Sequence, residues 1–145
     1  MSELPERWKA VAFAGVVLAS VTALFFAGAA LYPAPGFFEV RSVSLRVEGP
    51  GWTISYGAGT TANATAFGLL LEASDRLGFD VAFIRYAPPL DSVLVEAING
   101  TANGSGGLWW LYWVDGRYGE VGADRSVLRD DSVVLWAFRT YPPEA

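Results

Sequence analysis

The sequence predicts an α+β domain, in which one helix packs across a mixed or antiparallel sheet, preceded by a single N-terminal transmembrane helix. Three observations predict this arrangement. Residues 10–32 are apolar and carry no charge, several short runs between residues 43 and 138 have strand character, and residues 64–77 place apolar side chains at helical spacing. The helix can be laid across one face of the sheet.

The composition allows one domain and excludes several classes of function. The chain has 145 residues, of which 52% are hydrophobic, and 15 Asp plus Glu outnumber 10 Lys plus Arg. This acidic balance argues against nucleic-acid binding. Cysteine and histidine are both absent, which removes disulfides, zinc and haem ligation and the usual imidazole base. We therefore expect a protein that is not an enzyme and has no metal site and no cofactor of its own.

The N-terminal segment predicts membrane attachment. Residues 10–32 contain no charged side chain, and about 20 such residues cross a bilayer as a helix. Arg7 and Lys9 precede this run, and the first basic residue after it is Arg41. Positive residues favour the cytoplasmic side, so residues 1–9 are expected in the cytoplasm and the C-terminal domain outside, on a single-pass protein of the cell membrane.

Two interpretations of this segment stay open. The run is longer than the ~7 to 15 apolar residues of a cleaved signal peptide, which favours a retained signal anchor. Ala27-Gly28-Ala29, however, has the small residues of a cleavage site. Residues 33–41 follow as a linker, because Pro33 and Pro35 cannot continue the helix.

A hairpin is predicted next, because residues 43–48 and 52–56 alternate apolar and polar side chains around Gly49-Pro50-Gly51. Its apolar inner face consists of Val43, Leu45 and Val47 with Trp52, Ile54 and Tyr56.

A helix is predicted over residues 64–77. Asn63 or Thr61 can cap its start, and Gly78 suits the left-handed position after its end. One face should pack on the sheet, and it consists of Phe67, Leu70, Leu71, Ser74 and Leu77.

Two further strands are predicted over residues 81–86 and 92–98, followed by a tight turn at Asn99-Gly100. Asn63, Asn99 and Asn103 each begin an Asn-x-Ser/Thr pattern, which predicts glycosylation on an external domain. The same Asn and Gly residues also suit turns, and the two interpretations are compatible.

The aromatic strands over residues 109–114 and 133–138 have two apolar faces. Trp109 and Trp113 lie on one face of the first strand, and Trp110 and Tyr112 on the other. One helix can cover only one face. The other must be covered by a second sheet, a subunit, the membrane surface or a ligand, and we expect it to be the face of Trp110, Tyr112 and Trp136.

Exposed aromatic rings favour a binding module for a planar or amphipathic small molecule. The predicted ligand-binding residues are Trp110, Tyr112, Trp136, Tyr118 and Tyr86. The alternative is a structural or adhesive surface protein, in which the same face packs against another subunit or a component of the cell envelope.

Residues 42–140 resemble a known family, and residues 141–145 form a tail. The resemblance rests on the segments 61–73 and 98–100, on Trp110-Leu-Tyr112-Trp-Val-Asp115-Gly116, with Asp115 replacing the usual Asn, and on residues 128–136. These segments resemble the DUF4430 domain family, which is similar to the C-terminal domain of transcobalamin and intrinsic factor. The resemblance implies a β-grasp domain of the soluble-ligand-binding type, displayed at a surface, with a cobalamin-like ligand.

Overall fold

A computed structural model of the chain describes residues 38–143. The predicted cytoplasmic segment 1–9, the predicted transmembrane helix 10–32 and most of the linker lie outside these residues. Within residues 38–143, no helix has the length and apolar character needed to cross a bilayer.

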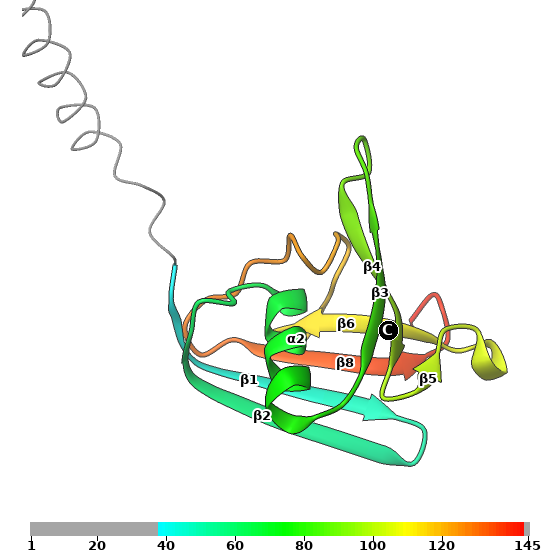
Figure 1. Ribbon diagram of the computed structural model, residues 1–145, viewed down its shortest axis with the longest axis horizontal. Coiled ribbons are helices and arrows are strands. Elements are labelled where there is room, and N and C mark those ends of the chain that lie inside the picture. The colour runs from blue at the N-terminus through cyan, green and yellow to red at the C-terminus, as the bar shows by residue number, and fades with distance from the viewer. Residues whose placement is uncertain (1–37, 144–145) are drawn as a thin grey trace, which may run out of the picture. The chain divides into compact units, whose positions relative to one another are not determined.

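The main sheet has five strands in the order β2-β1-β8-β6-β7 (Figure 1). The strands are β1 (Val40–Gly49), β2 (Trp52–Thr61), β6 (Trp109–Val114), β7 (Arg117–Tyr118) and β8 (Val133–Arg139). β1 and β8 pair parallel, and the other neighbours pair antiparallel. The prediction of a mixed sheet with one helix is therefore confirmed. Near the middle of this sheet, the first strand of the described residues, β1, pairs with the last strand, β8.

A second sheet contains β3 (Val81–Tyr86), β4 (Ser92–Ile98) and β5 (Thr101–Ala102), and a short 3-10 turn, η1 (Ser105–Gly107), follows it. Figure 1 shows the tip of the β3–β4 hairpin standing away from the main sheet. β3 and β4 have the predicted bounds. Asn99 and Gly100 form the predicted turn, with φ of 47° and 76°. The sequence predicted one sheet rather than two, because pairing between distant strands leaves no local signal.

The helix, α2 (Ala66–Leu77), begins at a different cap from either candidate. The Thr65 hydroxyl, and neither Asn63 nor Thr61, accepts the backbone N–H of Gly68 at 2.9 Å. Gly78 ends the helix at φ 75°, as predicted. The buried face is also rotated from the predicted one, because Leu77 is 51% exposed. The buried residues are Ala66, Phe67, Leu69, Leu70 and Ala73.

The helix covers the face of the sheet that we expected to be free. Val134 lies opposite Leu45 in the parallel pair of β1 and β8, and Trp136 lies opposite Val47. This register places Trp136 on the same face as the inner side of the hairpin, where its indole N–H donates to the carbonyl of Ala66 at 3.4 Å. The hairpin's inner face itself is confirmed, with Val47 fully buried.

Candidate functional site

Three of the five predicted ligand-binding residues are buried. Trp110, Tyr112 and Trp136 are 5%, 7% and 3% exposed. Their rings pack together across β6 and β8, with ring centroids of Tyr112 and Trp136 5.3 Å apart. Burial is the usual fate of such rings, and these three form a floor beneath α2 and the second sheet rather than an open surface.

The polar atoms of Trp110 and Tyr112, both on β6, form hydrogen bonds with neighbouring segments. The indole N–H of Trp110 donates to the carbonyl of Thr101 at 2.8 Å. The hydroxyl of Tyr112 donates to the carbonyl of Val121 at 2.6 Å, and burial raises the pKa of this phenol. The aromatic strand therefore anchors β5 on one side and the loop after β7 on the other.

Between these segments lies a groove of about 520 Å³, which we call the β6 groove. Its walls are β4 at residues 93–95, β6 at residues 109–112 and the loop 119–123. Four of the five predicted ligand-binding residues contribute to it, namely Trp110, Tyr112, Trp136 and Tyr118. Tyr86 does not, because it ends β3 on the protruding hairpin, where it is 39% exposed.

The β6 groove is lined without a single charged side chain. Trp109, 45% exposed, and Tyr141, 67% exposed, add aromatic surface at its rim. The ring of Tyr118 contacts Trp113 edge-on with centroids 5.7 Å apart, and burial raises its pKa. Such a surface accommodates flat apolar groups through large contact area and leaves no counterion for a charged group inside.

A more polar hollow adjoins the β6 groove and shares Tyr112, Tyr118 and Val121 with it. Asp115, Arg117, Glu120 and Arg129 contribute charged groups of both signs to this hollow. One end of a ligand that extends past Tyr118 would thus contact apolar side chains, and its other end would contact charged ones.

Asn103 closes one end of the β6 groove, a role that sequence reasoning missed. Its side-chain N–H donates to the carbonyl of Val95 at 2.8 Å, and its side-chain oxygen accepts the backbone N–H of Trp110 at 2.8 Å. One amide thus joins β4 to β6 where the two sheets meet. In the sequence, the Asn-Gly dipeptides at 99–100 and 103–104 indicate turns. No local pattern indicates that the Asn103 side chain connects β4 to β6.

Asp124 holds the opposite end. Its carboxylate accepts the backbone N–H of Val93 at 3.2 Å and forms an ion pair with Arg85 at 3.4 Å. The loop before it carries Gly122, where an added Cβ would lie 2.1 Å from the hydroxyl of Ser92. The groove is therefore fixed at both ends by side chains that bind backbone groups of β4.

The three predicted glycosylation sites differ in accessibility. Asn99 is exposed at the turn between β4 and β5. The side-chain N–H of Asn63 donates to the carboxylate of Glu72 at 2.7 Å, and that of Asn103 faces Val95 as described. Glycan attachment uses this same nitrogen, so Asn99 offers the open site of the three.

No protein-family model and no curated protein sequence matches this chain. Solved structures share its fold, and two of them are the following. A candidate metal-binding protein from Ruminococcus gnavus has a TM-score of 0.50 and 19% identity over 69% of this chain and 97% of its own. Haptocorrin in complex with Cbi has a TM-score of 0.51 and 17% identity over 70% of this chain. Only 25% of the haptocorrin chain takes part in this match.

At these identities the likeness concerns the fold, and it agrees with the transcobalamin-like architecture that the resemblance implied. Membership of the DUF4430 family stays a prediction. Within residues 38–143, no three acidic side chains come together in an arrangement that would hold a metal ion.

Proposed function

We propose that residues 38–143 form a binding module, which takes an uncharged, ring-bearing small molecule in the β6 groove. The observation that carries this proposal is an uncharged hollow in which the accessible rings of Trp109, Tyr118 and Tyr141 join the buried rings of Trp110, Tyr112 and Trp136. A volume of about 520 Å³ falls within the usual range of small-molecule sites. The module performs no chemistry of its own and needs no cofactor.

Cobalamin-like molecules are one candidate class, because haptocorrin shares the fold and was solved in complex with Cbi. The β6 groove would accept an edge of such a ring system, and the adjoining hollow would accept its polar substituents. Coordination of cobalt by imidazole plays no part, since the chain has no histidine.

The predicted N-terminal helix completes the proposal. A domain that follows a signal anchor at residues 10–32 would be displayed outside the cell membrane, where it would meet its ligand or a surface protein. The acidic composition fits this setting and disfavours nucleic acid as a partner.

The structural or adhesive alternative is less well supported. It required the face of Trp110 and Trp136 to contact another subunit, and both residues are already buried inside the domain.

A charged residue introduced into the wall of the β6 groove tests whether the ligand binds there. Leu94 is 42% exposed and lines the groove, so Leu94→Asp should leave the fold intact and place a carboxylate against the ligand. We expect the affinity for a bound ring compound to fall at least about tenfold, or roughly 1.4 kcal/mol. Titration of tryptophan fluorescence with cobalamin, other tetrapyrroles and glycans measures this affinity.

Leu90→Asp is the matched control, because Leu90 is 64% exposed on the same hairpin but outside the groove. This variant should bind like the unmodified chain. Equal losses in the two variants, or no fluorescence response to any of these compounds, would rule out the β6 groove as their site.

A further inference from the structure

The outer edge of β2 differs from every other sheet edge in residues 38–143. β5 and β7 have only two residues each. β3 carries Arg85 and has an irregular register between Ala82 and Phe83. β2 has ten residues without a charge or a proline, and β1 is the only described strand that pairs with it. Proteins normally protect edge strands with charges, prolines, bulges or short length, and β2 has none of these along residues 52–58.

The backbone of β2 presents its hydrogen-bonding groups outward at alternate residues. The N–H of Ser44 donates to the carbonyl of Ser132, the residue before β8, at 3.0 Å, so Ser44 points away from Gly57, its partner on β2. Residues in such a pair direct their backbone groups away from each other. Gly57 therefore faces the open edge, and by alternation Ser55 and Thr53 do so as well.

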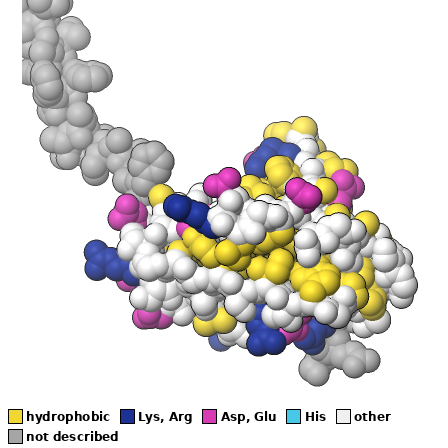
Figure 2. All heavy atoms as spheres, turned by 60° about the horizontal axis from the view of Figure 1, so that its bottom comes forward, with side chains coloured by type: hydrophobic (Ala, Val, Ile, Leu, Met, Phe, Trp, Pro, Cys, Tyr) yellow, Lys and Arg dark blue, Asp and Glu magenta, His cyan; other side chains and the backbone are white. Residues whose placement is uncertain are grey.

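The side chains beside this edge are apolar and incompletely buried. Trp52, Ile54 and Tyr56 pack against the core from β2 and remain partly accessible. Figure 2, turned so that the β2 side comes forward, shows a band of hydrophobic side chains across this side of the domain. A strand added to the edge would cover this band.

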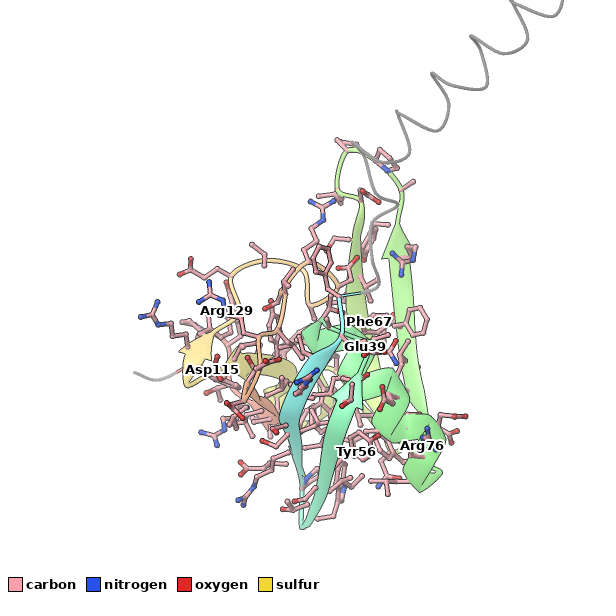
Figure 3. The ribbon with its side chains drawn as sticks, turned by 90° about the vertical axis from the view of Figure 1, so that its left-hand side faces the viewer. Glu39, Tyr56, Phe67, Arg76, Asp115 and Arg129 are labelled. Carbon is pink, nitrogen blue, oxygen red and sulfur yellow. The ribbon has the colours of Figure 1, made fainter. Side chains whose placement is uncertain are left out.

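Charges of both signs lie next to this edge. Arg76 of α2 is exposed, and its charge acts on Tyr56 and Glu72. Figure 3 shows Arg76 and Tyr56 at the same end of the domain. Arg76 also lines a hollow with Glu72, Asp75 and the last residues of β2, Thr60 and Thr61, so a second copy that docks on β2 brings the same acids and base to the contact.

We propose that two copies of this chain associate through β2, which pairs antiparallel with β2 of the second copy around a twofold axis at Ser55. In this register Thr53 of one copy lies opposite Gly57 of the other, and the outward backbone groups bond to each other. Ile54 and Tyr56 of the two copies then meet on the helix side. The proposal does not depend on the β6 groove, which lies beyond β1 and β8 in the sheet order.

The absence of cysteine from the chain allows a position-specific test. Opposed residues of a hydrogen-bonded antiparallel pair have Cα atoms about 5.5 Å apart, so Ser55→Cys in the full chain, extracted in detergent, should give a covalent dimer with a short thiol-to-thiol crosslinker. Ala82→Cys, at an exposed position of the β3 edge, is the control and should stay largely monomeric.

A second variant separates this interface from association through residues 10–32. Ser55→Lys places two ammonium groups opposite each other at the axis, and we expect the dimer to dissociate at least about tenfold more readily. Ser105→Lys, exposed in η1, should not change the mass measured by light scattering. Circular dichroism checks that both variants are folded.

Four results would overturn the proposal. The unmodified chain could be monomeric at every concentration, the dimer could persist in Ser55→Lys, or Ser55→Cys could crosslink no better than Ala82→Cys. Crosslinking of Ser55→Cys to a different protein would also overturn it, because the edge would then have another partner.

Discussion

At the residue scale, Glu72 ties α2 to β2 and to the segment after it through three hydrogen bonds. Its carboxylate accepts the hydroxyl of Tyr56 at 2.6 Å, the side-chain N–H of Asn63 at 2.7 Å and the hydroxyl of Thr61. Burial alone would raise the pKa of Glu72, but the hydrogen bonds from Asn63, Thr61 and Tyr56, with the charge of Arg76, outweigh it and lower the pKa below its ordinary value.

This lowered pKa makes stability depend on pH. Because the carboxyl is more acidic in the folded chain than in the unfolded one, its contribution is present above the ordinary carboxyl pKa and is lost as the pH falls through the folded value. We expect Glu72→Gln to lower the free energy of unfolding by about 1–3 kcal/mol at neutral pH and to flatten its decline in acid, below the ordinary carboxyl pKa. Urea unfolding at several pH values measures both.

Asp75→Asn, on the exposed side of the same helix, is the control for Glu72→Gln. It should keep the decline in acid that the unmodified chain shows. A Glu72→Gln variant with the same slope as the unmodified chain would contradict the role given to this carboxylate.

Asn103 gives a second prediction at this scale. Asn103→Asp keeps an acceptor for Trp110 but replaces the N–H donor to Val95 with an oxygen. An unpaired carbonyl beside a carboxylate should cost about 1–3 kcal/mol of unfolding free energy. Asn99→Asp is the matched control, since Asp tolerates the left-handed turn conformation there, and equal effects of the two changes in urea would contradict the bridge.

At the element scale, Gly119 sets how closely the loop after β7 approaches β6. A Cβ added at Gly119 would lie 2.0 Å from the ring of Tyr112, so Gly119→Ala should displace either the loop or the ring. We expect a loss of about 1–3 kcal/mol of unfolding free energy and a change in near-ultraviolet circular dichroism from the displaced tyrosine. Gly59→Ala, which has open space and an ordinary φ, should show neither change.

The elements themselves were largely predictable, because their signals are local. The strands predicted over residues 81–86 and 92–98 have the observed bounds of β3 and β4, and Gly78 marked the end of α2. The cap of α2 was predicted wrongly as Asn63 or Thr61, since Thr61, Asn63 and Thr65 all have suitable side chains within five residues. The choice among them depends on where the chain leaves β2, which is a matter of tertiary structure.

At the scale of the whole molecule, the sequence predicted the packing of the elements less well than it predicted the elements themselves. Four of the five predicted ligand-binding residues do meet in one groove, because they lie on strands whose faces alternate predictably. The face that α2 covers was predicted wrongly, since it depends on the parallel register of β1 and β8. Asn103 and Glu72 were missed as bridges for a similar reason, because their partners become neighbours only through folding.

The central pairing of β1 with β8 makes the domain depend on its last strand. Val47 is fully buried beside Trp136, and Arg139 of β8 reaches Glu48 of β1 at 3.0 Å. Val47→Ala removes two buried methyl groups at this junction and leaves a cavity, so we expect a loss of about 2 kcal/mol of unfolding free energy. Urea unfolding followed by tryptophan fluorescence and by far-ultraviolet circular dichroism should show one coincident transition at lower urea.

Val133→Ala is the matched control, because Val133 lies on β8 but is 52% exposed. It should shift the transition by less than about 0.5 kcal/mol. If fluorescence and circular dichroism separated into two transitions in the Val47→Ala variant, part of the domain would be stable without the β1–β8 junction. The two sheets would then unfold separately, despite the links that Asn103, Trp110 and the loop held by Asp124 make between them.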